Sequence, residues 1–254
     1  MHARTVPLLA VVLAASLGLS VAGSLEPPPG PVAPTMKTLL EIEPRTPIAS
    51  LPFTITSAGS YYLVGDLSTA GHGILVEASD VTIDLMGFTI TGPGPDSSTG
   101  LRLNSADHEN LTVRNGTFRS FEEGVVTRDG FEETLGNGVT VEGVRVLDIG
   151  LYGIDLRGGG HLVRNCLAVV SATPSPFLTD GIVVMDGLIE SSQARGFGVG
   201  LGVLGGTILN SVAIDGDYGI VAQGGVVNGC VARNNATQNL LLLGDAIAVD
   251  TYAP

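Results

Sequence analysis

A short unit that opens with glycine recurs along the chain and limits the folds available to it. The first example is a glycine with an alternating apolar strand at residues 73–76, a polar break, and a second alternating strand at residues 80–84. Equivalent openings begin at Gly73, Gly100, Gly124, Gly153, Gly181, Gly200 and Gly219, at steps of 27, 24, 29, 28, 19 and 19 residues. Self-similarity at roughly 20–30 residues is typical of a solenoid, in which successive units stack on one another.

The ordered part of the chain reads as all-β. After residue 36, no run long enough for a helix has apolar residues at i, i+3, i+4 and i+7. Glycine, at 36 of 254 residues, is about twice its usual share of ~7%. We expect one β-solenoid domain at residues 71–254 with about seven or eight coils. An N-terminal cap is expected at residues 38–70, because the end of a solenoid needs an atypical unit over its last apolar layer.

The N-terminal region has the features of an export signal. Arg4 gives a short basic start, Leu8–Leu19 an apolar run, and Ser20–Ala22 a small-residue cleavage site, so residues 1–22 are predicted to be a signal peptide. The apolar run is shorter than the ~20 residues of a membrane span. Residues 23–37 read as a stiff proline-rich linker. We therefore expect a secreted or periplasmic protein with no membrane span after signal removal.

The charge of the chain disfavours polyanionic partners. Without the signal peptide, 11 Lys and Arg (12 less Arg4) face 25 Asp and Glu, a formal charge of −14. Nucleic-acid binding proteins show a basic footprint instead, so nucleic acid is not expected as a partner. Attraction of an acidic polysaccharide by the whole protein is also disfavoured, although local arginine clusters or a bridging Ca²⁺ would reverse this. No other cofactor is evident.

Alignment of the second strands places special residues in vertical columns. The first column after the strand contains Asn115, Gly143, Asn165, Ser191, Asn210 and Gly229. Asn and Gly tolerate a left-handed backbone, which predicts a tight turn between two sheets. The next column contains Gly116, Val144, Cys166, Ser192, Ser211 and Cys230. These residues are mostly small, as inward positions beside a tight turn should be.

The two cysteines occupy equivalent positions three coils apart. At ~4.8 Å per coil, Cys166 and Cys230 are expected to lie roughly 14 Å from each other. A disulfide requires Cα atoms within ~7 Å. The alignment therefore predicts two free, buried thiols, even though export usually favours a disulfide.

An outward column of alternating charge precedes the turn. It contains Asp84, Arg114, Glu142, Arg164 and Glu190. Opposite charges on neighbouring strands stabilise their pairing by about 0.2–1 kcal/mol. The column is interpreted as a surface ladder that sets the register, with a substrate-binding stripe as the alternative.

Four segments near the start of the repeat are distinctive: Glu43–Ile48, Leu51–Thr56, Gly59–Leu63 and Val81–Phe88. They resemble the opening of secreted bacterial right-handed parallel β-helix proteins of the pectin-lyase-like fold group, and the likeness extends over about residues 43–235. The resemblance implies a right-handed parallel β-helix. It leaves the activity open, because the group contains polysaccharide lyases, hydrolases, epimerases and members without known chemistry.

One tripeptide resembles part of a hydrolase motif. Thr179-Asp180-Gly181 is similar to the Asn-Thr-Asp-Gly motif of polygalacturonases, with Leu178 in place of the Asn. No Lys follows Lys37, and the family's further adjacent Asp pair and later Gly-His-Gly are missing. Inverting hydrolysis needs an acid and a base carboxylate, and the sequence does not assemble that pair.

A second short stretch resembles an epimerase motif. Tyr152–Asp155 is similar to the start of the Tyr-Gly-x-Asp-Pro-His motif of alginate C5-epimerases, but Leu156 and Arg157 replace Pro and His. The residue that would exchange the proton is therefore missing, and the stretch reads more simply as the opening of a coil.

A lyase would need a cation to neutralise a uronate carboxylate and a base to remove the C5 proton. Arg128 and Arg157 share an outward column on adjacent coils, and Asp155 lies two residues from Arg157. These three are the candidate catalytic residues. The simpler interpretation is that they are solvated charges on a sheet face.

Two hypotheses on function follow. The first is an exported, non-catalytic module that binds extracellular glycans or serves a surface or structural role. The alternative is a polysaccharide lyase, hydrolase or epimerase that acts on an extracellular acidic polysaccharide through Arg128, Asp155 and Arg157. The missing motifs favour the first.

Overall fold

The computed structural model describes residues 44–96, 98–104, 108–127, 136–172 and 179–254. The predicted signal peptide, the proline-rich linker, the start of the predicted cap and Arg128 lie outside the described residues. The described residues belong to one compact unit, Glu43–Pro254. Every regular element in them is a β-strand.

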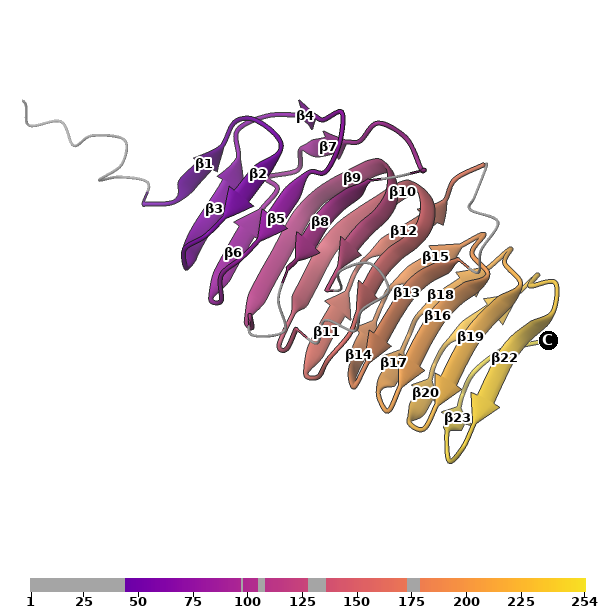
Figure 1. Ribbon diagram of the computed structural model, residues 1–254. Coiled ribbons are helices and arrows are strands. Elements are labelled where there is room, and N and C mark those ends of the chain that lie inside the picture. Colours follow the sequence, from indigo (N-terminus) through magenta and orange to yellow (C-terminus); the bar gives the residue numbers. More distant parts are fainter. Residues whose placement is uncertain (1–43, 97, 105–107, 128–135, 173–178) are drawn as a thin grey trace, which may run out of the picture. The chain divides into compact units, whose positions relative to one another are not determined.

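The strands are wound into an all-β, right-handed parallel β-helix, as the sequence predicts (Figure 1). Each coil contributes one strand segment to each of three parallel ladders. Successive segments of one ladder come from successive coils, so residues one coil apart lie side by side. The two long strands β9 (Leu111–Val126) and β10 (Thr140–Leu156) pass through all three ladders.

Ladder 1 contains β2 (Phe53–Ile55), β5 (Ile74–Val76), β8 (Thr99–Leu103), the ends of β9 and β10, β13 (Asp180–Met185), β16 (Val199–Leu204), β19 (Tyr218–Gln223) and β22 (Gln238–Leu243). Ladder 2 contains β1 (Thr46–Ile48), β3 (Gly59–Leu63), β6 (Val81–Asp84), the starts of β9 and β10, β11 (His161–Arg164), β14 (Gly187–Glu190), β17 (Thr207–Leu209), β20 (Val226–Asn228) and β23 (Ile247–Val249). Ladder 3 contains β4 (Leu67–Ser68), β7 (Thr89–Thr91), the middles of β9 and β10, β12 (Leu167–Val170), β15 (Gln193–Arg195), β18 (Val212–Ile214) and β21 (Val231–Arg233).

Parallel pairing begins before the first glycine-led unit. Strands β2, β3 and β4 pair with β5, β6 and β7 of the next coil. The region in which we expected a cap, from Thr46 onward, therefore contributes strands to the same three ladders.

The recurring glycines form one column in ladder 1, and the reason for glycine there is close contact between coils. A Cβ atom on Gly153 would collide with the carbonyl oxygen of Gly181, and one on Gly124 would collide with that of Gly153. The same relationship holds at Gly73 and Gly181 with the glycine of the next coil. A side chain at this position would therefore push two coils apart, which explains the repeat seen in the sequence.

The predicted turn column has the left-handed backbone expected of it. The φ angles are 58° at Asn115, 61° at Gly143, 53° at Asn165, 49° at Ser191, 48° at Asn210 and 64° at Gly229. Asn and Gly, which tolerate positive φ at low steric cost, suit this turn from ladder 2 to ladder 3. The alignment of the coils is thereby confirmed.

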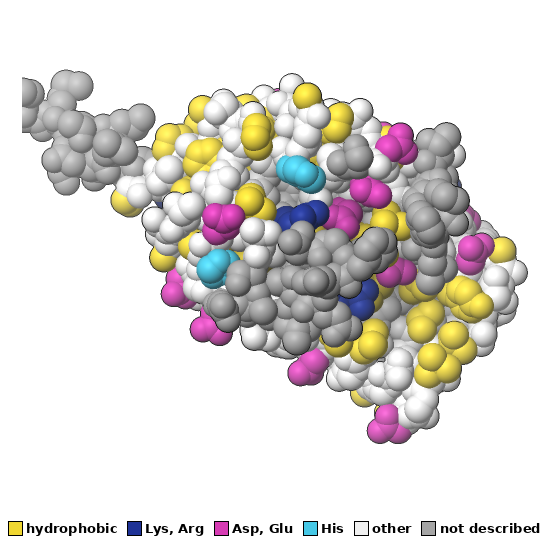
Figure 2. All heavy atoms as spheres, in the orientation of Figure 1, with side chains coloured by type: hydrophobic (Ala, Val, Ile, Leu, Met, Phe, Trp, Pro, Cys, Tyr) yellow, Lys and Arg dark blue, Asp and Glu magenta, His cyan; other side chains and the backbone are white. Residues whose placement is uncertain are grey.

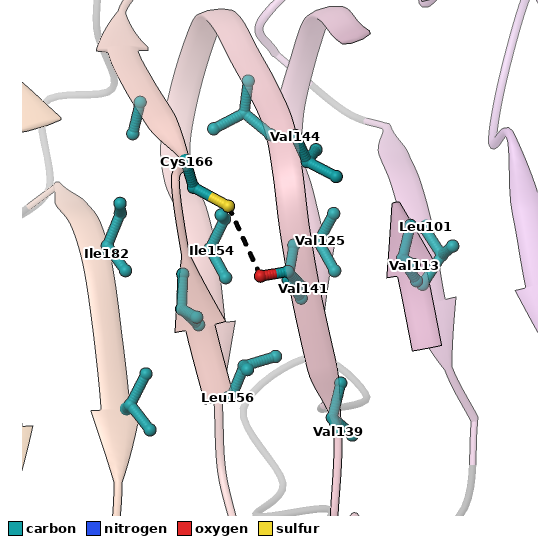
Figure 3. Close-up of a cluster of buried hydrophobic side chains, with 14 of the residues drawn as sticks. Leu101, Val113, Val125, Val139, Val141, Val144, Ile154, Leu156, Cys166 and Ile182 are labelled. Atoms are coloured by element: carbon teal, nitrogen blue, oxygen red, sulfur yellow. Dashed lines mark hydrogen bonds between the residues drawn. The ribbon is translucent and has the colours of Figure 1, made fainter. Parts of the chain in front are cut away.

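Aliphatic side chains from the three ladders fill the interior, and both cysteines belong to this core. Figure 3 shows Cys166 among its neighbours. Cys166 and Cys230 are free and buried, as predicted. The Cys166 thiol donates a hydrogen bond to the carbonyl of Val141, with the sulfur 3.5 Å from the oxygen. Because a carbonyl oxygen of the neighbouring coil accepts a hydrogen bond from each thiol, the cysteines behave as small core residues.

The alternating charges of ladder 2 are paired as predicted. Arg114 Nε lies 3.0 Å from Asp84 Oδ2, and Arg164 Nη2 lies 2.8 Å from Glu142 Oε1. The arginine side chains remain 43% and 42% exposed, so each pair contributes little, about 0–1 kcal/mol. These pairs support the register of adjacent coils.

Candidate functional site

The outer face of ladder 1, here called face 1, carries several polar side chains that can do chemistry. The residue before each column glycine points outward, and these residues stack from coil to coil. They are His72, Thr99, Glu123, Tyr152, Asp180, Val199 and Tyr218. The next outward column runs through Leu75, Arg102, Val126, Asp155, Val183, Gly202 and Val221. In-register stacking of parallel coils thus brings residues far apart in sequence onto one surface. The two columns adjoin, since Arg102 Nη2 lies 3.0 Å from Thr99 Oγ1.

Two of the three predicted catalytic residues meet as an ion pair. The Arg157 guanidinium donates to both oxygens of Asp155, with Nε 2.6 Å from Oδ1 and Nη2 3.0 Å from Oδ2. The Asp155 side chain is 0% exposed and that of Arg157 is 22% exposed. Asp155 is therefore not the solvated surface charge of the simpler interpretation. Arg128 lies outside the described residues.

The neighbouring coil holds Arg157 in place. The Arg157 backbone N–H donates to Thr127 Oγ1 over 2.6 Å, and the Thr127 hydroxyl donates to the Arg157 carbonyl over 3.1 Å. Partial burial disfavours the charged guanidinium, but the hydrogen bonds that Arg157 donates to Asp155 and the charges of Asp155 and Asp180 outweigh burial and raise the pKa of Arg157. The arginine is a fixed cation at the surface of face 1.

A second polar cluster, which was not predicted from the sequence, lies closer to the N-terminus on face 1. The Thr99 hydroxyl donates to Glu123 Oε2 over 2.8 Å, and Arg102 Nη2 lies 3.3 Å from the same oxygen. The Thr99 backbone N–H donates to His72 Nδ1 over 3.2 Å. Three of these residues come directly before a column glycine, so aligning that position in the repeat would have found them.

Face 1 has two hollows beside these clusters. The first, of about 230 Å³, is lined by Leu75, Thr54, His72, Arg102 and Asn104, among others. Its lining combines aliphatic side chains such as Ile74 and Leu75 with polar ones. The hollow is smaller than the ~300–1,000 Å³ of sites for drug-sized ligands, which suits a unit as small as one sugar ring.

The second hollow, of about 210 Å³, lies next to the ion pair. Arg157 and Asp180 line this hollow. Val183, Gly202 and Val221, which belong to the second outward column of face 1, line it as well. Gly202 leaves a depression because the neighbouring coils carry valines at the equivalent position. Figure 2 shows hydrophobic side chains gathered over β16, β19 and β22 in this part of the molecule, and charged side chains nearer the N-terminal coils.

The geometry of the ion pair bears on what face 1 can do. Both oxygens of Asp155 accept from Arg157, and the Glu123 carboxylate accepts from Thr99 and Arg102. Proton abstraction from a substrate requires a base within hydrogen-bond reach of it. A fully buried carboxylate bound by a guanidinium through both oxygens does not offer that reach.

Two further properties of the described residues are relevant. No group of three His, Cys, Asp or Glu among them is arranged to hold a metal ion. The described part of the chain also has no helix with the length and hydrophobicity needed to cross a membrane.

Comparison of the chain with protein-family models, with curated proteins and with solved structures gives no match. The function is therefore inferred from the geometry of face 1 and from the sequence.

Proposed function

We propose that the protein is an exported, non-catalytic glycan-binding module whose ligand lies across face 1. The observation that carries the proposal is the closed Asp155–Arg157 pair, in which the buried carboxylate is held by both oxygens. Within the predicted catalytic cluster, Asp155 and Arg157 are bound to each other, which supports a role of Arg157 in holding a ligand rather than in moving a proton. The signal-like residues 1–22 support export.

The composition of the two hollows supports a carbohydrate ligand. A sugar ring presents hydroxyl groups at its edge and C–H groups on its faces. The linings of the hollows combine aliphatic side chains such as Leu75 and Val221 with polar groups such as His72, Asn104 and Arg157. A fixed guanidinium beside a small hollow would hydrogen-bond hydroxyl or carboxylate oxygens. The resemblance to the pectin-lyase-like group, whose members often act on polysaccharides, is consistent with this ligand.

Filling the hollows tests the proposal directly. Leu75→Trp and Val221→Trp each place a large side chain in one hollow, and Val226→Trp places the same side chain on the outer face of ladder 2 as a control. Binding to pectate, alginate and neutral glycans is measured by calorimetry on the purified protein. We expect the two face 1 variants to lose affinity at least tenfold while Val226→Trp keeps it. Equal binding by all three variants would overturn the assignment of face 1.

The enzymatic alternative makes a different prediction for the same glycans. A lyase would release unsaturated 4,5-ends, and a hydrolase would release reducing sugar, with or without added Ca²⁺. Either product would overturn the non-catalytic proposal. If Arg157→Ala then abolished turnover, the catalytic role would belong to the ion pair, whereas unchanged turnover would remove it from the reaction.

A further inference from the structure

The outer face of ladder 3, here called face 3, carries an arginine cluster on an acidic protein. Arg119, Arg145, Arg195 and Arg233 point outward from β9, β10, β15 and β21, and all four are exposed. The paired positions of this ladder from β7 to β21 hold no Asp or Glu among the described residues. The formal charge of the whole chain, by contrast, is −13.

Two carboxylates lie close to this ladder, and both have partners. Asp148 sits at the irregularity in β10, where the pairing register shifts, and its Oδ2 accepts from the Ser120 hydroxyl over 2.6 Å. Asp215, directly after β18, pairs with Arg195, with Nε 3.0 Å from Oδ2. Asp148 follows Leu147, the register partner of Arg119, whereas Asp215 follows Ile214 on the coil between those of Arg195 and Arg233. Asp215 therefore neutralises Arg195 and leaves Arg119, Arg145 and Arg233 as the charges without a carboxylate partner among the described residues.

The arginines of face 3 differ from those of ladder 2 in their pairing. Arg114 and Arg164 in ladder 2 are each neutralised by a carboxylate on the adjacent coil. In the part of the chain that the structure describes, Arg119, Arg145 and Arg233 form no such pair. Their charge is therefore available to a partner.

The arginines are spread along the stack rather than concentrated at one point. Arg145 pairs with Thr117, and Leu147 pairs with Arg119, so Arg119 and Arg145 are diagonal neighbours on adjacent coils. From β9 to β21 the ladder advances five strand spacings, about 24 Å at ~4.8 Å each. Arg195 and Arg233 stand two spacings apart, about 10 Å.

The surface between the arginines is aliphatic. The other outward residues from β10 to β21 are partly buried and include Leu147, Leu167, Val169, Val212, Ile214 and Val231. Exposed arginines and partly buried aliphatic side chains alternate over several coils of this face. Such a face suits an extended chain that lies along the stack of coils.

We propose that face 3 binds a linear acidic polysaccharide, with its carboxylate or sulfate groups on Arg119, Arg145, Arg195 and Arg233. The guanidinium fork matches such oxyanions, and the apolar strips between the arginines cover the C–H faces of the sugars. Successive arginines stand one to two strand spacings apart, about 5–10 Å, so the acid groups of one extended chain reach them in turn. Face 3 is the local cluster that lets an acidic protein bind an acidic chain.

Other polyanions fit this surface less well. Duplex DNA carries one charge per ~1.7 Å and would be repelled more strongly by the remaining acidic surface. Single strands are bound by stacking on aromatic side chains, and the outward positions of ladder 3 from β7 to β21 hold no aromatic residue. A surface that inserts into an anionic membrane has protruding apolar side chains. The aliphatic residues of face 3 are partly buried instead.

The inference concerns a different face from the proposed function and depends on it only for the carbohydrate class of the ligand. The matched test removes two charges from each of two faces. Arg119→Gln with Arg145→Gln alters face 3, and Arg114→Gln with Arg164→Gln makes the same change of net charge on ladder 2. Binding of the full chain to polygalacturonate and to heparin is measured at low and at high salt, with neutral dextran as a blank.

We expect the face 3 double variant to bind either polyanion about a hundredfold more weakly, because each of the two lost charged contacts contributes roughly one factor of ten. The ladder 2 double variant should stay within about twofold, and salt should weaken the wild-type complex. Equal losses in both double variants, or no loss in either, would overturn the proposal. Tighter binding to a DNA duplex or to phosphatidylglycerol vesicles than to either polysaccharide would overturn the ligand class.

The variants also separate this inference from the proposed function. Leu75→Trp and Val221→Trp act on face 1 and should leave salt-dependent binding on face 3 unchanged. If those two variants alone abolish binding to the acidic polymers, face 3 is not the site. If only the face 3 variant matters, the role proposed for face 1 fails and that of face 3 stands.

Discussion

The backbone N–H of Cys166 donates to the hydroxyl oxygen of Ser192, 3.2 Å away on the next coil. Ser192 repeats the relationship, because its own N–H donates to Ser211 Oγ over 3.1 Å. The inward column of small residues that contains Cys166, Ser192 and Ser211 therefore does more than fill space. Its hydroxyl groups satisfy backbone donors that the ladders leave unpaired at the corner.

Ser192→Ala should destabilise the coil stack by about 1–3 kcal/mol, because it leaves the buried Cys166 N–H without an acceptor. Urea denaturation followed by circular dichroism measures the effect. Ser60→Ala, at an exposed position of β3, serves as the control and should change little. If the two variants have the same denaturation midpoint, the hydroxyl column does not contribute to stability.

Gly153→Ala tests the contact between coils. A Cβ there would meet the Gly181 carbonyl oxygen and would also lie 3.1 Å from the Ala168 Cβ, so we expect a loss of about 1–3 kcal/mol or more from overpacking. Gly71→Ala is the matched control, since a Cβ on Gly71 has no atom within 4 Å. The melting temperature should fall sharply for the first variant only. A similar melting temperature for both would show that the column glycines are not needed for close approach.

The buried thiols should be unreactive in the folded protein. Burial raises the pKa of Cys166 to about 11, against partial opposition from nearby backbone groups. Burial also raises the pKa of Cys230. At pH 8 roughly 0.1% of Cys166 would then be thiolate, the species that reacts.

An assay with a thiol-reactive dye at pH 8 should therefore find slow labelling of the native protein and rapid labelling of two thiols in urea. Mass spectrometry of the unreduced protein should show both cysteines unlinked. Fast labelling before unfolding, or a bond between Cys166 and Cys230, would contradict the buried, separate positions that the structure gives them.

The sequence predicts the fold well because the constraints recur in every coil. The glycine column and the left-handed turn at Asn115 and Asn210 each depend on one position of the repeat. Because every coil stacks in the same way, each coil needs the same residue type at that position. For the same reason, the pairing of Asp84, Arg114 and Glu142 in one column follows from their spacing along the chain.

The candidate site was less predictable, because it depends on what the loops and neighbouring coils bury. Adjacency of Asp155 and Arg157 followed from strand alternation, but the complete burial of Asp155 did not. The cluster of Thr99, Arg102 and Glu123 joins residues from coils of unequal length. Its register becomes clear only when the residue before each glycine is aligned.

His161 makes stability depend on pH in a predictable direction. The side chain is 3% exposed, and its Nδ1 accepts from the Val139 N–H over 3.3 Å. Burial lowers the pKa of His161, only partly opposed by the Arg157 backbone and by Asp186. The unfolded chain therefore binds a proton at a higher pH than the folded chain does, and stability falls as the pH drops below the unfolded value of ~6.5.

His161→Gln keeps a hydrogen-bond acceptor near Val139 but cannot titrate, so it isolates this effect. We expect the free energy of unfolding of the wild type to decrease between about pH 7.5 and pH 5.5, with a slope of at most ~1.4 kcal/mol per pH unit from this group. The variant should be less stable at the upper end of that range but should lose less on acidification. Because His72 and His108 are present in both proteins, the difference between their two pH slopes reports on His161 alone. Parallel slopes would show that the buried imidazole takes up its proton without cost to the fold.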